Sequence, residues 1–287
     1  MIPYPLLLGD RPFVWGERTY LMGILNITPD SFSDGGEFYQ IDAALTQANQ
    51  LVVAGADILD VGGQSTRPGA IEISLQEELG RVIPVIQNLR PTLDCPISID
   101  TTRSDVAIAA IAAGADIIND VSGGEADAAM FTTVAELGVP YILMHRRGTP
   151  ETMQTLTHYD NVITELIRYF RERLEVATKA GIDCNRIILD PGIGFAKTAA
   201  QNIEIFQGLG ELRQLGCPIL VGPSRKSFIG HLLNQPDPKE RVWGTAAACC
   251  GAIAQGVDIL RVHDVSPMAQ VCRVADALWR SDRRIGA

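Results

Sequence analysis

Short apolar runs alternate with longer amphipathic stretches along most of this chain. The runs are rich in Ile, Leu and Val and each breaks at a polar residue, which is typical of strands buried on both faces of a parallel sheet. The longer stretches carry apolar residues at helical spacing. The predicted strands are 21–25, 58–61, 97–99, 117–118, 141–144, 187–189, 219–221 and 259–262. The predicted helices are 42–54, 75–89, 104–113, 126–137, 161–180, 201–215, 226–233, 241–254 and 267–279.

Three of the helix-to-strand junctions are nearly identical in sequence: residues 55–57 and 114–116 read Gly-Ala-Asp, and residues 256–258 read Gly-Val-Asp. We expect the Gly to end each helix in the left-handed backbone region, and the Asp to begin the next strand. Repeated strand–helix units of this kind form parallel sheets. Eight such units favour an α/β fold with one closed (β/α)₈ TIM barrel over a doubly wound sheet.

The chain has no Pro- or Gly-rich linker, which predicts a single domain. Residues 1–19 contain several Pro and Gly residues and are expected to form a short N-terminal cap or hairpin within that domain. Residues 20–287 are expected to form the barrel. A length of 287 residues with 46% hydrophobic content would also allow two ordinary domains, so the repeat pattern decides.

Composition excludes several kinds of partner. The formal net charge of -10 argues against nucleic acid and against an anionic membrane surface. A small anionic substrate remains compatible, because a local cationic group acts over roughly 10 Å. The chain has no basic leader and no apolar run of about 18 residues, which predicts a cytoplasmic protein. The six Cys show no CxxC spacing, so we expect buried thiols rather than a disulfide framework or a zinc site.

Polar residues follow the apolar runs, where the carboxyl ends of barrel strands would meet at one rim and bind ligands. Those residues are Asn26, Asp60, Asp100, Asn119, His145, Asp190, residues 224–227, Arg261 and His263. A single one would more often be a helix N-cap, whereas a whole set is typical of a binding site. Asp100, Asn119 and Asp190 offer acceptors and an amide suited to a planar heterocycle with NH and NH₂ donors.

Arg261 and His263 fall on the same face of one strand end. Together they suit a phosphate or pyrophosphate group. The alternative is that these two side chains form ion pairs with a neighbouring carboxylate, Asp258 or Asp264.

Residues 222–227, Gly-Pro-Ser-Arg-Lys-Ser, predict a tight turn that opens a helix, with free N–H groups directed at the rim. The run lacks the spacing of a P-loop. Lys226 is expected to donate to a ring carbonyl or ring nitrogen. Its alternative, a solvated lysine in the first helical turn, is disfavoured because a cation there opposes the helix dipole.

Two segments of the rim, residues 28–38 and 62–70, are rich in Gly and polar residues and are expected to be long, flexible loops. The second has Gly near both ends, which favours a lid over a reacting centre. An ordinary irregular loop is the alternative.

Taken in order, these motifs resemble the dihydropteroate synthase family over nearly the whole chain. The matching stretches are 26–36 (NITPDSFSDGG), 60–63 (DVGG) with 65–70 (STRPGA), 98–101 (SIDT), 119–121 (NDV), 143–145 (LMH), 189–195 (LDPGIGF), 224–227 (SRKS) and 261–264 (RVHD). The resemblance implies a transferase on a (β/α)₈ pterin-binding barrel. It would join 6-hydroxymethyl-7,8-dihydropterin diphosphate to 4-aminobenzoate, with Mg²⁺ as cofactor and a homodimer as the assembly.

The resemblance also implies a role for each matching residue. The catalytic set comprises Asn26, Asp34, Arg67, Lys226, Arg261 and His263. Asn26 and Asp34 would hold Mg²⁺, while Arg261 and His263 would bind the diphosphate with Asn26. Asp100, Asn119, Asp190 and Lys226 would bind the pterin, with Met144 and Phe195 packing near the ring. Val121 and Gly222 would also be substrate-binding. The aminobenzoate would contact Phe32, Thr66, Arg67, Pro68 and Ser227.

The chemistry agrees with these roles. An arylamine is a weak nucleophile, so departure of diphosphate should run ahead of attack. The electron-rich pterin can carry the developing cation while Arg261, His263 and Mg²⁺ take up charge on the leaving group. No side chain need act as a covalent nucleophile. Closure of the two loops would exclude water, which otherwise captures the cation.

Two departures from the family pattern and two alternatives remain. Gln64 stands where the family commonly has Glu, and Arg146 where Met is frequent; both belong to loops rather than to the pterin-binding residues. The first alternative is the pterin-binding barrel of a folate–corrinoid methyltransferase, which would not need residues 224–226 or two mobile loops. The second is a non-catalytic pterin-binding regulator, which would have no use for a leaving-group site.

Overall fold

The structure is a computed structural model and describes residues 3–27, 37–65 and 69–280. The strands are β1 (Leu6–Leu8), β2 (Arg11–Phe13), β3 (Tyr20–Asn26), β4 (Ile58–Gly62), β5 (Ile97–Asp100), β6 (Ile117–Asp120), β7 (Tyr141–Met144), β8 (Ile187–Asp190), β9 (Leu220–Val221) and β10 (Ile259–Val262). The helices are α1 (Glu37–Val53), α2 (Leu75–Leu89), α3 (Ser104–Ala113), α4 (Met130–Leu137), α5 (Val162–Lys179), α6 (Ala199–Leu212), α7 (Ser227–Leu233), α8 (Val242–Ala254) and α9 (Val265–Trp279).

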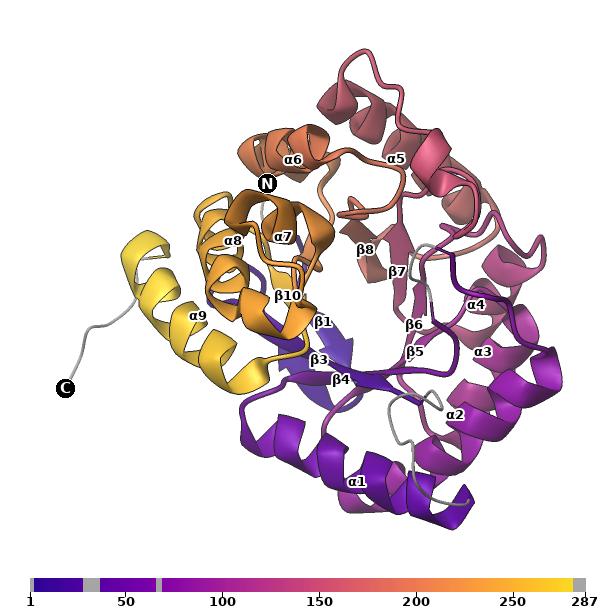
Figure 1. The fold of residues 1–287 in the computed structure, drawn as a ribbon. Coiled ribbons are helices and arrows are strands. Elements are labelled where there is room, and N and C mark those ends of the chain that lie inside the picture. Colours follow the sequence, from indigo (N-terminus) through magenta and orange to yellow (C-terminus); the bar gives the residue numbers. More distant parts are fainter. Residues whose placement is uncertain (1–2, 28–36, 66–68, 281–287) are drawn as a thin grey trace.

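Strands β3 to β10 form one parallel sheet at the centre of the molecule, and the helices surround it (Figure 1). The strand order is β8-β7-β6-β5-β4-β3-β10-β9. A parallel bridge between Leu189 in β8 and Ile219, just before β9, joins the two ends of that order. The sheet is therefore closed, and the predicted (β/α)₈ TIM barrel is confirmed.

Most predicted boundaries agree with the structure to within a few residues, and α2, α3, β7 and β10 agree at both ends. Helix α4 begins at Met130 rather than at 126, because the Asp127 carboxylate holds the preceding residues in a turn. Asp127 Oδ1 accepts from the Ala129 N–H at 2.9 Å, and Oδ2 accepts from the N–H and the hydroxyl of Ser104 at 2.8 and 2.6 Å. Helix α1 begins at Glu37 rather than at 42.

Alternate residues of the strands point to the two faces of the barrel wall and form two separate cores. The outward residues pack against the helices. The inward residues form a second cluster with the side chains of an N-terminal hairpin, in which β1 pairs antiparallel with β2. This inner cluster comprises Leu6, Leu8, Phe13, Trp15, Tyr20, Met22, Ile58, Ile117, Ile142, Ile188, Leu220 and Ile259.

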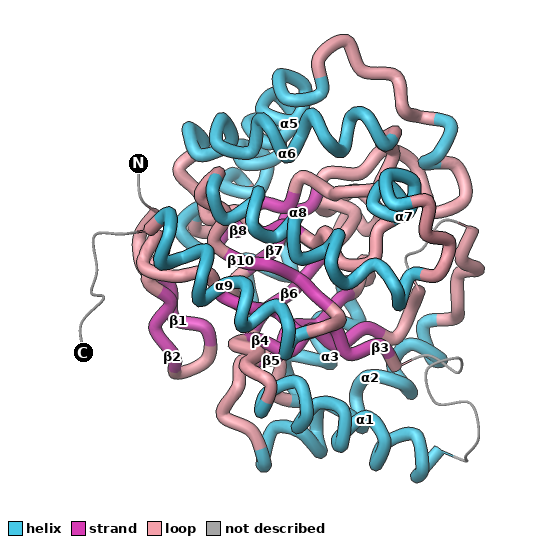
Figure 2. Tube along the Cα trace, turned by 60° about the vertical axis from the view of Figure 1, so that its left-hand side comes forward, coloured by secondary structure: helices cyan, strands magenta, loops and turns pink. Residues whose placement is uncertain are grey.

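Figure 2 shows the hairpin at one end of the barrel strands. It shares the inner cluster with inward residues near the start of the barrel strands, β5 excepted, so it closes the amino-terminal end of the barrel. The assignment of residues 1–19 as a cap in the same domain as residues 20–287 stays a prediction.

The three near-identical junctions share one structural device. Their glycines, Gly55, Gly114 and Gly256, have φ angles of +109°, +113° and +83°, in the left-handed region predicted from the sequence. The aspartate two residues after each of them accepts a backbone N–H at or next to the start of a neighbouring strand, and an arginine pairs with it. The three sets are Asp57 with Leu21 and Arg18, Asp116 with Ile97 and Arg90, and Asp258 with Ile219 and Arg213. The junctions therefore fix the register of adjacent strands.

The other sequence predictions concern membranes and thiols. Within the described part of the chain, no helix is both long and apolar enough to cross a membrane. All six cysteines lie in the described part and are free, as predicted. Cys184 is exposed and Cys250 is partly exposed, which departs from the expectation of buried thiols.

We predict that Gly114→Ala destabilises the fold while Gly80→Ala does not. A Cβ at Gly114 would lie 2.7 Å from the Arg90 side chain, and its φ of +113° disfavours any side chain. The expected loss is about 1–2 kcal/mol in the free energy of unfolding, measured by denaturant titration. A Cβ at Gly80, inside α2, would have nothing within 4 Å, so its replacement should stabilise by about 0.4–1 kcal/mol. Equal effects of the two changes would contradict this account of the junction.

Candidate active site at the carboxyl-terminal rim

Polar side chains lie directly above the inner apolar layer, at the carboxyl-terminal ends of the strands, which we call the rim. The cause is the two-residue period of a strand: the residue two positions after an inward Ile also points inward. Asp60 follows Ile58 in this way, and Asp190 follows Ile188. Asn119, Met144 and Arg261 follow the inward Ile of their own strands in the same way. Side chains that the sequence assigns to ligand binding therefore come from different strands and meet at the rim.

Arg261 links the rim across the barrel. Its Nε donates to Asp60 Oδ2 at 2.6 Å, and its Nη2 donates to Asp100 Oδ2 at 2.7 Å. Asp60 is fully buried and also accepts from the Asn119 amide nitrogen at 3.2 and 3.3 Å. A buried carboxylate needs such partners, because an unpaired charge in the interior is very costly. Strands β4, β5, β6 and β10 are thus joined by one network.

Asp100 keeps an unused acceptor in this network. Its Oδ1 is buried and has no hydrogen-bond partner among the described residues. Burial raises the pKa of Asp100 to about 7, with Arg261 opposing the shift and Asp60 adding to it. An N–H donor from a ligand would satisfy Oδ1, since buried polar atoms without partners are rare in folded proteins.

Asp190 and Met144 lie side by side at the ends of β8 and β7. Asp190 Oδ1 accepts from the Gly192 N–H at 2.7 Å. Burial raises the pKa of Asp190, while the Gly192 hydrogen bond, Lys226 and Arg261 oppose the shift. Both side chains are buried, so the apolar thioether and the carboxylate form one surface that is shielded from solvent.

Lys226 lies over an aromatic ring from the neighbouring loop. Its Nζ is 4.3 Å from the centre of the Phe195 ring. Lys226 is the N-cap of α7 and is half-buried, so it is not a fully solvated lysine inside the first turn. Ser227 is the first residue of α7 and is exposed, and a Cβ added at Gly222 would lie 3.7 Å from the Cβ of Arg261.

His263 is positioned by the serine of the same turn. Ser224 Oγ accepts from the His263 N–H at 3.1 Å and lies 3.0 Å from His263 Nδ1. The alternative ion pair of Arg261 with Asp258 or Asp264 is wrong, because Arg261 pairs with Asp60 and Asp100. Asp264 instead pairs with Arg225 at 2.6 Å.

Several predicted site residues lie at the edge of what the structure describes. Asn26 is the last residue of β3, opposite Gly62 of β4, and is partly exposed. Val121 is buried directly after β6. Phe32, Asp34, Thr66, Arg67 and Pro68 lie outside the described residues. Among the residues that are described, no three His, Cys, Asp or Glu side chains form a group that could hold a metal ion.

Two residues at this end of the barrel differ from what the sequence indicates. His145, expected at the rim with the other polar strand ends, points away from the barrel interior and is buried beneath the β8–α6 loop. There it meets Lys197, a buried lysine that the motifs do not single out. The two-residue period provides a signal for His145, since Ile142 and Met144 point inward. Nothing in the spacing identifies Lys197.

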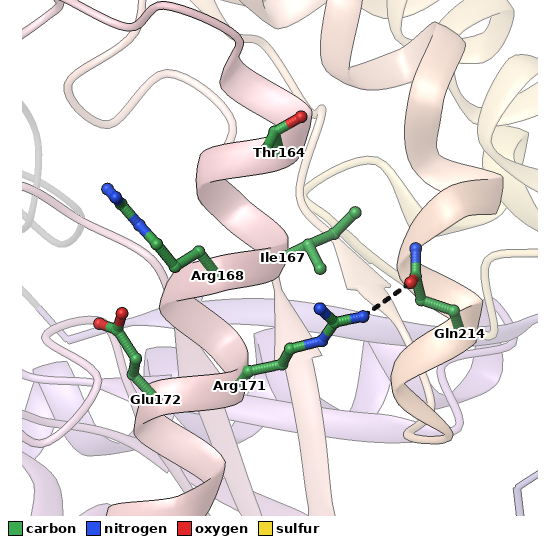
Figure 3. Close-up of a pocket in the computed structure, with 6 residues that line it drawn as sticks. All are labelled: Thr164, Ile167, Arg168, Arg171, Glu172 and Gln214. Atoms are coloured by element: carbon green, nitrogen blue, oxygen red, sulfur yellow. Dashed lines mark hydrogen bonds between the residues drawn. The ribbon is translucent and has the colours of Figure 1, made fainter.

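A surface pocket of about 270 Å³ lies elsewhere, between α5 and the turn that carries Gln214 (Figure 3). Arg171 Nη2 donates there to Gln214 Oε1 at 2.9 Å. Its other lining residues are Thr164, Ile167, Arg168 and Glu172. The buried acceptors and the cation network lie at the rim instead, which makes the rim the candidate active site.

Comparison with known proteins also indicates a pterin-binding enzyme. A family described as pterin binding enzyme matches residues 22–263. The dihydropteroate synthase of Synechocystis sp. is 60% identical over 278 residues, which cover 97% of this chain and 96% of that protein. The solved dihydropteroate synthase of Xanthomonas albilineans with 4-aminobenzoic acid superposes with a TM-score of 0.90 at 42% identity, over 97% of this chain and 98% of that one.

A second structure from Xanthomonas albilineans, in complex with 7,8-dihydropteroate, gives a TM-score of 0.87 at 40% identity over 96% and 98% of the two chains. Identity and fold thus agree over nearly the full length of this chain. The chain therefore belongs to the pterin-binding enzyme family and, within it, to the dihydropteroate synthases.

Proposed function

We propose that this chain, a transferase, joins 6-hydroxymethyl-7,8-dihydropterin diphosphate to 4-aminobenzoate and releases 7,8-dihydropteroate and diphosphate. The observation that carries this proposal is the rim network, in which buried carboxylates from two strands, Asp60 and Asp100, accept from Arg261. Related proteins of the same family bind 4-aminobenzoic acid and 7,8-dihydropteroate in solved structures. These are one substrate and the product of the proposed reaction.

The buried acceptors would read the pterin ring. Asp100 Oδ1 has no partner among the described residues and suits a ring N–H donor. The Asn119 amide nitrogen donates to Asp60, so we assign the amide oxygen to a second ring donor. Asp190 would accept further donors, and Lys226 would donate to the ring carbonyl or a ring nitrogen. Met144, Phe195, Val121 and Gly222 would supply the surrounding surface.

The leaving diphosphate would lie toward β10. Arg261 uses Nε and Nη2 for the two carboxylates, and we assign its Nη1 to the diphosphate, with His263 as a second donor. Asn26 ends β3, the strand next to β10, and so lies on the same side of the rim.

The donor set also suits Mg²⁺. The Asn26 amide oxygen and the carboxylate of Asp34, which lies outside the described residues, are hard oxygen ligands. Mg²⁺ commonly uses one or two protein ligands together with substrate phosphates. When bound, Mg²⁺ would supply charge stabilisation for the leaving group. The roles of Asn26 and Asp34 as its ligands remain part of this proposal.

The residues would act by binding and orientation rather than by covalent catalysis. Loss of diphosphate precedes attack, because an arylamine is a weak nucleophile. Arg261 and His263 would stabilise the negative charge that develops on the leaving oxygen. Phe32, Thr66, Arg67, Pro68 and Ser227 would hold the aminobenzoate for attack and exclude water from the cation.

A homodimer and a cytoplasmic location stay predictions. The dimer follows from the resemblance, and the exposed side chains of Leu232, Leu233 and Trp243 near the start of α8 are consistent with it. A sedimentation measurement would test it directly.

The decisive test is release of diphosphate that depends on both 4-aminobenzoate and Mg²⁺. The proposed synthase requires both. A folate–corrinoid methyltransferase barrel would release no diphosphate, and a non-catalytic regulator would bind the pterin without turnover. Either of these outcomes would reject the proposal.

We predict that substitutions at the two sides of the rim affect the binding of different substrates. Asp190→Asn and Lys226→Ala should each weaken pterin binding by about tenfold or more, since each removes a charged hydrogen bond. Arg67→Ala should mainly raise KM for 4-aminobenzoate. Steady-state kinetics with each substrate varied in turn would show the difference. Unchanged aminobenzoate kinetics in Arg67→Ala would remove Arg67 from that role.

We also predict that pterin binding weakens as the pH falls through neutrality. Burial raises the pKa of Asp100 to about 7, so its carboxylate is present above that pH and becomes protonated below it. Loss of the acceptor should weaken binding by up to about tenfold per pH unit. Calorimetry with 6-hydroxymethylpterin, which has no phosphate to titrate, would measure this. Asp100→Asn should bind weakly with a flatter profile, and an unchanged slope in that variant would contradict the assignment.

A further inference from the structure

Lys197 is a buried lysine with no part in the scheme above. It is 3% exposed, and its Nζ makes three short contacts. Nζ donates to the Gly192 carbonyl at 3.0 Å and to the Phe195 carbonyl at 2.9 Å, and it lies 3.0 Å from His145 Nδ1. In its charged form an ammonium has three donors, so these contacts satisfy it fully. Burying a lysine is costly, which calls for a reason beyond packing.

The loop that Lys197 holds is strained and tightly curled. Gly192, Gly194 and Ala196 have φ angles of +68°, +83° and +52°. A left-handed conformation costs about 1–2 kcal/mol for a residue with a side chain, so Ala196 needs support from its surroundings. The Lys197 ammonium gives that support, because it draws the Gly192 and Phe195 carbonyls to one point.

The same loop carries three features of the pterin side of the rim. The Gly192 N–H donates to Asp190 Oδ1 at 2.7 Å. The Phe195 ring lies 4.3 Å from Lys226 Nζ, and a Cβ at Gly194 would lie 3.2 Å from the Lys226 side chain. Any change in the curl of this loop would therefore move the partners of Asp190 and Lys226 together.

The His145 ring holds the Lys197 ammonium in place and is itself fixed by its neighbours. Its backbone N–H donates to the Asp190 carbonyl at 2.9 Å, and its ring meets the Tyr169 ring edge-on at 4.7 Å. Burial, aided by Lys197, lowers the pKa of His145 well below its usual value. The imidazole is therefore neutral and can accept from the ammonium at Nδ1.

Lys197 also acts on Asp190 through charge. Burial lowers the pKa of Lys197 to about 7, and Asp190 opposes that shift. Lys197 in turn is among the groups that oppose the raised pKa of Asp190. The charged lysine thus favours the ionised carboxylate from the side of the loop that faces away from the rim.

We propose that Lys197, anchored on His145, is a positioning residue that sets the β8–α6 loop for pterin recognition. It fixes the Gly192 N–H on Asp190 and the Phe195 ring beneath Lys226, without touching substrate itself. This inference rests on the proposed function, because it assigns the pterin to that side of the rim.

The test compares Lys197→Met with Lys179→Met, a change at an exposed lysine of α5. Lys197→Met keeps the apolar stem and removes the ammonium, so we expect the dissociation constant for 6-hydroxymethylpterin to rise by about tenfold or more. KM for 4-aminobenzoate should change by less than about twofold, since the other half of the rim is untouched. Lys179→Met should match the parent in both measurements. Binding is measured by calorimetry and turnover by diphosphate release.

Two further variants keep the test decisive if Lys197→Met does not fold. Lys197→Gln retains two of the three N–H donors, and we expect it to fold and to weaken pterin binding by about threefold to tenfold. Lys197→Arg retains the charge and should recover part of the affinity. Parent-like pterin binding in folded Lys197→Gln would overturn the proposal. So would a loss shared equally between the two substrates, which would indicate a purely structural role. A parent enzyme that binds the pterin but releases no diphosphate would instead reject the proposed function.

Discussion

The rim depends on the ion pairs of Arg261 with Asp60 and Asp100. These carboxylates come from adjacent strands and are both buried, so their negative charges would repel each other without a cation between them. Removing one partner from such a buried pair typically costs about 3–5 kcal/mol. The guanidinium can reach both because its planar fork offers several donors in fixed directions. It therefore holds together strands that are distant in the sequence and keeps acceptors directed at a ligand.

The apolar layer below the rim makes this arrangement effective. Inward Ile, Leu and Met side chains, closed from below by the N-terminal hairpin, keep water from the lower half of the barrel. A low local dielectric strengthens each charged hydrogen bond above it and raises the pKa values of Asp100 and Asp190. The fold thus couples stability to recognition: the same alternation that fills the barrel with hydrocarbon brings the next polar residue into its opening.

Local patterns in the sequence predict most of the fold and the direction of several rim side chains. They do not predict contacts that depend on a long side chain or on the conformation of a curled loop. The strands, most helix limits and the left-handed glycines such as Gly114 follow from short-range rules of periodicity and capping. The inward direction of Asp60 and Asn119 follows from the two-residue period. The partners of Arg261 do not, because a long flexible side chain can reach several carboxylates and only the closed barrel selects among them. Lys197 lies in a loop whose curl no periodic pattern encodes.

Charge balance at the rim explains how an acidic protein can handle an anionic substrate. The chain has a formal net charge of -10, yet the carboxylates of Asp60, Asp100 and Asp190 are matched by nearby cations. Arg261 and Lys226 act from the barrel interior and the α7 turn, while Lys197 acts from beneath the β8–α6 loop. The net charge of the pterin side is therefore close to zero. Such a surface suits an uncharged ring that carries many hydrogen-bond donors. The diphosphate then meets local cations rather than the net negative field, which is screened beyond roughly 10 Å.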